Sequence, residues 1–161
     1  MNKEIYMRTH IIQIHPVTRD NWEQALEISL HENQKHLVPS ITERLAYAYI
    51  KPWDEAFDPY VLQIEGKIIG FFYISYTPES TDNYWIGGFQ IDKTSQGQGM
   101  GKRALRAIID FITYKHPLCQ IISLTVERGN HIAQHLYTSM SFVSENLTNS
   151  DDEIIYRLKI R

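Results

Sequence analysis

The chain has 161 residues, of which 43% are hydrophobic and 22% are charged, and its formal net charge is −3. This length suits one domain with a sizeable apolar core, and the slightly acidic balance gives no sign of a nucleic-acid partner. The single cysteine, Cys119, excludes an intrachain disulfide, and no apolar run approaches the length of a membrane span.

The N-terminal third is predicted to form a strand and two helices. Residues 11–17 alternate enough for an opening strand, and Asp20 is a plausible cap for the first helix. Ser40 is followed three residues later by Glu43, the pattern of a capping box, so a second helix is expected to start there. Residues 1–8 lack the apolar core of a secretory signal, and we expect them to be a flexible N-terminal extension.

The middle of the chain is predicted to contain three antiparallel strands. Residues 60–64 and 68–76 are rich in strand-forming side chains and flank a turn sequence that contains Gly66. A polar loop follows, and residues 84–92 form another apolar run. This run would be the fourth strand of the chain.

The C-terminal half is predicted to alternate helices and strands. Leu105, Ile108, Ile109 and Ile112 recur at the spacing of one helical face, which lays an apolar stripe on a sheet. A β-rich run at residues 121–126, another helix and two late strands complete the pattern. The expected fold class is therefore α/β, with a mixed sheet flanked by helices.

A glycine-rich turn joins the fourth strand to the next helix. Residues 96–102 read Gln-Gly-Gln-Gly-Met-Gly-Lys. Glycines let the backbone turn sharply and approach a ligand closely, and the first N–H groups of the helix lack intrahelical partners. Four basic residues and no acid lie between Lys93 and Arg106. The turn is thus a predicted site for an anion such as a phosphate.

Two common phosphate-binding loops do not fit this turn. A P-loop needs Ser or Thr after its Gly-Lys pair, whereas Lys102 is followed by Arg103. A dinucleotide fingerprint would need its third glycine at position 102. The pattern that fits is Q-x-x-G-x-G, formed by Gln96, Gly99 and Gly101, although glycines that serve only to turn the chain would look the same.

A second motif lies downstream. Asn130, Ala133, Leu136 and Tyr137 form the pattern N-x-x-A-x-x-L-Y after a β-rich run. Together the two motifs resemble the GNAT superfamily of N-acyltransferases, in which the glycine turn holds the pyrophosphate of acetyl-CoA. The resemblance covers nearly the whole chain. It implies a single domain over residues 1–161, whose central, mostly antiparallel sheet opens at the fourth strand.

The resemblance implies transfer of an acetyl group from acetyl-CoA to a primary amine, with no metal. In the family, main-chain groups at the end of the fourth strand pair with the pantetheine arm, and an asparagine lies near the CoA arm. The cofactor contacts carried over in this way are Phe89, Gln90, Ile91, Gln96, Gly97, Gln98, Gly99, Met100, Gly101, Lys102 and Asn130.

Tyr137 is the candidate general acid by the same resemblance. A phenol is protonated at neutral pH and can give its proton to a departing thiolate. Helical spacing alone would also allow a core tyrosine here. Many relatives place a carboxylate base on the fourth strand, but this chain has Gly87 and Gly88 there. The base is left open between Glu32, Glu79, Asp82 and ordered water.

The N-terminal third of the chain gives the evidence on the acceptor amine. Eight acids and three bases lie between Asp20 and Asp58, a balance suited to a polycation. The segments at 31–40 and 70–72 resemble bacterial spermine and spermidine acetyltransferases. A polyamine is therefore the preferred acceptor, with Glu32, Glu79, Asp82 and Trp85 as candidate substrate contacts.

The sequence also allows other acceptors and another function. The acceptor could be an amino acid, an aminoglycoside or a protein N-terminus, and the chain could instead be a CoA-binding regulatory module that has lost catalysis. We expect a cytoplasmic protein without nucleic-acid or membrane partners. A homodimer is open, because domains of this family are often dimers, but no segment of the sequence identifies an interface.

Overall fold

The computed structural model describes residues 2–5 and 10–161. Half of the expected extension at residues 1–8 lies outside the described residues, and within it residues 3–5 are helical. The remaining elements follow in the order β1 (Gln13–Pro16), α2 (Trp22–Leu26), η1 (Glu32–Leu37), α3 (Ile41–Ile50), β2 (Ala56–Ile64), β3 (Lys67–Tyr76), β4 (Tyr84–Ile91), η2 (Lys93–Ser95), α4 (Met100–Lys115), β5 (Ile121–Val126), α5 (His131–Ser139), β6 (Val143–Thr148) and β7 (Ile154–Lys159).

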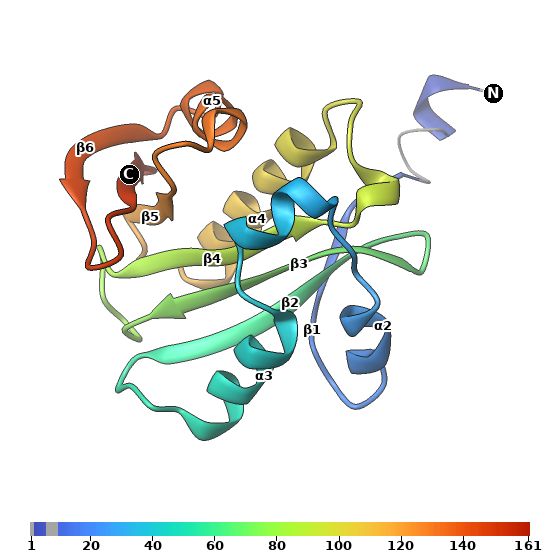
Figure 1. The fold of residues 1–161 in the computed structure, drawn as a ribbon, viewed down its shortest axis with the longest axis horizontal. Helices are drawn as coiled ribbons and strands as arrows, with labels where there is room; N and C mark the ends of the chain where they lie inside the picture. Colours follow the sequence, from blue (N-terminus) through green and yellow to red (C-terminus); the bar gives the residue numbers. More distant parts are fainter. Residues whose placement is uncertain (1, 6–9) are drawn as a thin grey trace.

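The strands form one seven-stranded sheet in the order β1-β2-β3-β4-β5-β7-β6. Neighbouring strands are antiparallel except for β4 and β5, which are parallel. In Figure 1, α2, η1 and α3 lie in front of the sheet and α4 lies behind it. The predicted mixed α/β fold is confirmed.

The sheet opens where β4 meets β5. These strands pair at a single position, Trp85 with Ser123, whereas β4 runs alongside β3 from Tyr84 to Ile91. Among the described residues, no strand pairs with the rest of β4 on its β5 side. The opening at the fourth strand, which the sequence resemblance implied, is confirmed.

Helix α4 anchors the back of the sheet. Of its predicted apolar stripe, Leu105, Ile108 and Ile112 have no exposed surface, and Ile109 is partly buried. They pack in one core cluster with residues from β2, β3, β4, β5 and β7. Burying an aliphatic side chain of this size contributes about 1.5–3 kcal/mol, so the helix that follows the glycine turn is firmly fixed.

Two local predictions about the N-terminal helices had different outcomes. Ser40 does cap α3, because its hydroxyl accepts a hydrogen bond from the Glu43 N–H at 3.2 Å. The prediction that Asp20 caps the first helix is wrong, since the N-cap residue is Asn21. The Asn21 side chain instead bridges the backbone of Pro16 and Thr18, which fixes the end of β1.

Candidate active site

The glycine turn has a left-handed backbone over three consecutive residues. Gly97, Gln98 and Gly99 have φ angles of 89°, 54° and 74°, and α4 begins immediately after them at Met100. A side-chain carbon added at Gly97 or Gly99 would meet nothing within 4 Å. These glycines therefore serve the backbone conformation, and the space beside the first turn of α4 is open to a ligand.

Gln96 ties the turn to two other elements. Its side-chain amide donates to the Ile91 carbonyl at 3.0 Å and exchanges two hydrogen bonds with the Gln34 amide of η1, at 2.9 and 3.0 Å. Gln34 was not singled out from the sequence. The motif glutamine thus holds the loop against the end of β4 and against η1.

The basic residues beside the turn differ in their surroundings. Lys102 is exposed, whereas the Arg103 guanidinium donates to the His10 carbonyl. Arg103 is therefore partly occupied in fixing the N-terminal segment, and Lys102 is free to face solvent beside the turn.

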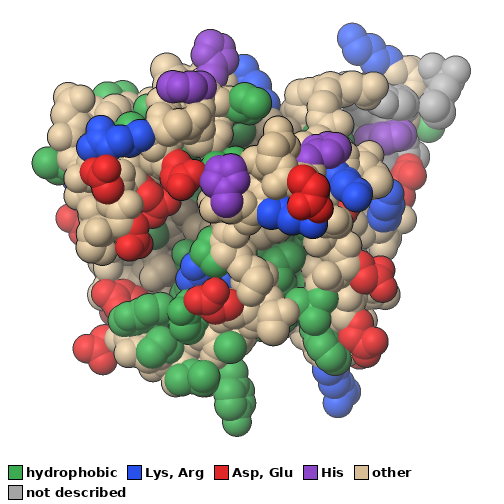
Figure 2. Space-filling view, in the orientation of Figure 1, with side chains coloured by type: hydrophobic (Ala, Val, Ile, Leu, Met, Phe, Trp, Pro, Cys, Tyr) green, Lys and Arg blue, Asp and Glu red, His purple; other side chains and the backbone are tan. Residues whose placement is uncertain are grey.

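One long groove, with a volume of about 1170 Å³, runs from the glycine turn through the opening between β4 and β5. One end is bordered by the turn and α5, and the other lies on the α3 side of the sheet. In Figure 2 this face is hollowed, with acidic side chains gathered on the left near β6 and the β6–β7 turn. The candidate cofactor residues that line the groove are Phe89, Gln90, Ile91, Gln96, Gly97, Gly101 and Asn130.

The open part of β4 carries a bulge. Its pairing with β3 shifts by one residue between Phe71 and Tyr73, and Gly88 has a φ of 61°. Gln90 is a buried polar residue whose side-chain amide donates to the Gly88 carbonyl at 3.2 Å. A bulge re-aims the strand, and here it lies in the stretch that β5 leaves unpaired.

Tyr73 of β3 occupies the space above Gly87. A Cβ added at Gly87 would lie 2.1 Å from the Cζ and 2.2 Å from the hydroxyl of Tyr73. The Tyr73 ring stacks on Phe57 at 4.1 Å, and the Arg44 guanidinium lies 5.5 Å from its centre. Burial raises the pKa of Tyr73, so its hydroxyl remains protonated well above neutral pH.

Tyr137 faces the groove from α5. Asn130 caps this helix by accepting from the Ala133 N–H at 3.2 Å, and Tyr137 is only 9% exposed. Within the described chain, its hydroxyl has no hydrogen-bond partner. Burial raises the pKa of Tyr137 to about 12, which keeps the phenol protonated and able to donate. The position suits both a general acid and a largely buried tyrosine that borders a ligand site.

The side chains that line the groove include four carboxylates and one arginine, Arg44. The Arg44 Nε is buried and has no hydrogen-bond partner among the described residues. The carboxylates are Glu55, Glu127, Asp151 and Glu153. Of these four, only Glu55 comes from the acidic N-terminal third. Most acidic side chains of that segment therefore do not line the groove.

Glu153 is the most fixed of these carboxylates. It accepts hydrogen bonds from the Asn149 side-chain amide at 2.9 Å and from the Thr125 hydroxyl at 3.4 Å. Its own N–H donates to the Asn149 side chain at 2.9 Å. Glu127, Asp151 and Glu153 were not predicted from the sequence. For Asp151 and Glu153, the available signal was the acidic, turn-forming run at residues 149–153.

The predicted substrate contacts are divided. Trp85 lines the groove, with its indole N–H bonded to Asn83 at 2.8 Å. Glu32 is 88% exposed and pairs with Lys35 at 2.6 Å, away from the groove lining. Glu79 and Asp82 are exposed residues between β3 and β4, and they do not line it either. The structure therefore brings only Trp85 of these four to the site.

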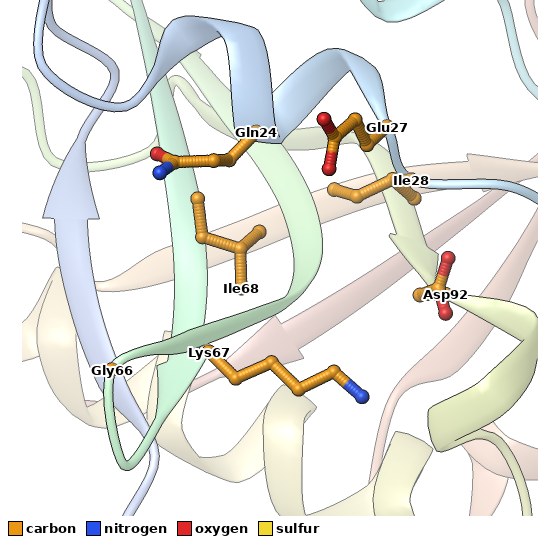
Figure 3. Close-up of a pocket in the computed structure, with 7 residues that line it drawn as sticks. All are labelled: Gln24, Glu27, Ile28, Gly66, Lys67, Ile68 and Asp92. Atoms are coloured by element: carbon orange, nitrogen blue, oxygen red, sulfur yellow. The ribbon is translucent and has the colours of Figure 1, made fainter.

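A second, smaller cavity lies between α2 and the β2–β3 hairpin, near Gln24, Glu27, Lys67 and Asp92 (Figure 3). Asp92 accepts from the N–H groups of Ser29 and Thr94, at 2.8 and 3.1 Å. Burial alone would raise its pKa, but these hydrogen bonds and that from the Thr94 hydroxyl lower it. Asp92 thus holds the segment that leads into the glycine turn, and it lies outside the groove.

None of the described helices is long and apolar enough to cross a membrane. No group of three or more His, Cys, Asp or Glu side chains in that part of the chain is arranged to hold a metal ion.

Comparison with known proteins gives a consistent result. Residues 21–142 match the model of the acetyltransferase (GNAT) family. A probable spermine N(1)-acetyltransferase from Bacillus subtilis subsp. natto (strain BEST195) is 32% identical over 140 residues, which are 81% of this chain and 87% of that protein.

Solved structures share the fold at lower identity. An aminoglycoside acetyltransferase, AAC(6')-Ib in complex with coenzyme A, has a TM-score of 0.74 at 16% identity, over 92% of this chain and 95% of that one. The spermidine N-acetyltransferase from Vibrio cholerae, in complex with CoA and spermine, has a TM-score of 0.69 at 18% identity, over 91% and 93% of the two chains.

Proposed function

The chain belongs to the acetyltransferase (GNAT) family, and we propose that it moves an acetyl group from acetyl-CoA to a primary amine of a polyamine such as spermidine or spermine. The main support for this proposal is that one groove connects the parts of the site. It joins the glycine turn, the unpaired edge of β4, Tyr137 and a set of carboxylates.

The cofactor end of the groove fits acetyl-CoA. The left-handed turn and the first turn of α4 offer backbone N–H groups to a pyrophosphate beside open space at Gly97 and Gly99. Phe89, Gln90 and Ile91 lie in the stretch of β4 that is not paired with β5, where an extended pantetheine arm can pair as an added strand; the Ile91 carbonyl already accepts from the Gln96 amide. Asn130 contributes chiefly by starting α5 at the right place.

Tyr137 is the proposed general acid. Acetyl-CoA supplies a thioester, whose carbonyl carbon is attacked by the neutral amine nitrogen. As the carbon–sulfur bond breaks, the Tyr137 hydroxyl gives its proton to the sulfur of the departing thiolate. The raised pKa keeps Tyr137 in the form that has this proton to give. The nitrogen loses two protons in all, and one of them restores Tyr137 while the other leaves to solvent.

The acceptor end supports a cationic, flexible substrate. Four carboxylates against one arginine favour a polycation over an anionic acceptor. Trp53, Phe57, Tyr73 and Trp85 also line this groove. Their rings can cover the methylene segments of a polyamine and make cation–π contacts with its ammonium groups. The two relatives named for spermine and spermidine, at 31–32% identity, point the same way.

Release of the CoA thiol, followed with a thiol reagent, tests this proposal. Purified protein would be mixed with acetyl-CoA and, separately, spermidine, spermine, free amino acids, an aminoglycoside and a peptide with a free N-terminus. We expect turnover with the polyamines, confirmed by mass spectrometry of the acetylated product. Turnover with only one of the other amines would replace the polyamine assignment. Tight binding of acetyl-CoA without turnover on any amine would instead identify a CoA-binding module.

A further inference from the structure

Strand β4 cannot supply a proton acceptor at the reaction centre. Beyond its pairing with Ser123, β4 continues through Gly87 and Gly88, and the ring of Tyr73 fills the place of a side chain at Gly87. A polyamine nitrogen is an ammonium ion at neutral pH and must lose a proton before it can attack. The group that receives this proton must therefore come from another element.

Glu153 reaches the same level of the opening from the other side. Because β4 and β5 are parallel and pair at Trp85 and Ser123, Gly87 and Thr125 each lie two residues further along, and both line the groove. Paired residues and their second neighbours share one face of a sheet, so both positions face the α3 side. Thr125 donates its hydroxyl to the Glu153 carboxylate, which places this carboxylate at the level of Gly87.

The charge of Glu153 also acts across the groove. Tyr73 is the direct partner of Gly87 in β3, and the negative charge of Glu153 adds to the rise in its pKa, of which burial is the main cause. Glu153 thus faces the part of the groove where β4 carries no side chain. Asn149 and Thr125 hold it there through hydrogen bonds, while part of the carboxylate stays available to a ligand.

We propose that Glu153 binds the ammonium group of the acceptor and takes the proton that its nitrogen must lose, with Thr125 and Asn149 as positioning residues. This inference rests on the proposed amine acetylation.

The proton balance is simple. One N–H bond of the ammonium breaks, its proton moves to a Glu153 carboxylate oxygen, and the electron pair left on nitrogen forms the bond to the thioester carbon. The second proton lost by nitrogen replaces the one that Tyr137 gives to sulfur. Glu153 then releases its proton to solvent, so one proton leaves per acetyl group transferred.

The pH behaviour of this site involves several neighbours. Besides Tyr137 and His131 of α5, the titratable or charged groups that line the same groove are His36, Arg44, Glu55, Tyr73, Glu127 and Asp151. Arg44 and Tyr73 come from α3 and β3, and Asp151 comes from the β6–β7 turn. Mutating Glu153 alone leaves all of these in place, which makes the change in a pH profile attributable to one group.

The test compares Glu153→Gln with Asp152→Asn. Glutamine keeps the shape of Glu153 but cannot accept a proton. Asp152 is the preceding acid of the same turn, is exposed, pairs with Arg128 and does not line the groove. At about pH 7.5 we expect Glu153→Gln to lower kcat/KM for spermidine by about 100-fold, the lower end of general-base effects. Asp152→Asn should change it less than about threefold, as expected for an exposed pair.

The pH profile separates a proton acceptor from a merely structural residue. The deficit of Glu153→Gln should shrink as the pH approaches about 10, where the amine is increasingly neutral in solution. Thr125→Val, which removes one hydrogen bond to the carboxylate, should show a smaller deficit with the same trend. Equal activity of Glu153→Gln and wild type, or a deficit that is constant with pH in a folded variant, would overturn the assignment. Absence of wild-type turnover on any amine would instead overturn the proposed function.

Discussion

The contact between Gly87 and Tyr73 gives a sharp prediction about the acceptor end of the groove. Gly87→Ala would place a Cβ 2.1–2.5 Å from three atoms of the Tyr73 side chain, far inside normal contact distance. The ring cannot move aside freely, because it stacks on Phe57 at 4.1 Å and lies beside Arg44. We therefore expect Gly87→Ala to lower the free energy of unfolding by about 1–3 kcal/mol, the usual cost of overpacking.

A double-mutant cycle isolates the cause of that loss. Tyr73→Ala removes the ring, so adding Gly87→Ala to it should cost less than about 0.5 kcal/mol, because alanine is otherwise tolerated in a strand. Urea unfolding of the four proteins gives the coupling free energy directly. An equal cost of Gly87→Ala with and without the Tyr73 ring would refute the contact.

The same pair should affect the two substrates unequally. Gly87→Ala should raise KM for the amine, whereas the dissociation constant for acetyl-CoA, which is proposed to bind at the glycine turn, should change by less than about twofold. An increase confined to the acetyl-CoA constant would mean that Gly87 lies at the other end of the reaction centre.

Three further changes test other parts of the site. Tyr137→Phe should lower kcat by about 10²–10³-fold with unchanged acetyl-CoA binding by calorimetry, and unchanged kcat would remove Tyr137 from the mechanism. In wild type, no alkaline loss of kcat from Tyr137 is expected below about pH 11, since its pKa is raised to about 12. Gln96→Ala removes the hydrogen bonds to Ile91 and Gln34, so it should lower the free energy of unfolding by about 1–3 kcal/mol and weaken acetyl-CoA binding. Unchanged acetyl-CoA binding would show that these hydrogen bonds are not needed to hold the glycine turn in its binding conformation. Asp92 has a lowered pKa, so its stabilising effect is present above its ordinary pKa of about 4 and is lost as the pH falls through the folded value. The difference in Tm between wild type and Asp92→Asn should accordingly shrink between about pH 7 and about pH 3, and a difference that is constant with pH would contradict it.

The glycine turn and the helices beside it were predictable because their sequence signals are local. The order strand, glycine turn and helix lies within one short segment, and the cap at Asn130 is formed by residues three positions apart. Hydrophobic spacing likewise predicted α4 and its buried stripe. Such patterns depend on the backbone of their own element and survive in almost any tertiary context.

The acceptor end was not predictable in the same way. Glu153, Thr125 and Tyr73 are far apart in sequence: Thr125 and Glu153 meet because β5 pairs with β7, and Tyr73 lines the same groove from β3. The exposed acids proposed from the sequence were chosen for charge or for nearness to β4 along the chain. Nearness along the chain does not determine which way a side chain faces, and Glu32 is instead paired with Lys35.

A crystal structure with bound CoA and spermine is the decisive test of the proposed site. We expect the pyrophosphate against the N–H groups of residues 98–102, the pantetheine arm along the free edge of β4 and the sulfur within hydrogen-bonding distance of the Tyr137 hydroxyl. We also expect a spermine nitrogen on the α3 side, beside the Glu153 carboxylate. CoA bound outside the opening between β4 and β5, or spermine bound away from Glu153 with its nitrogens remote from the sulfur, would contradict it.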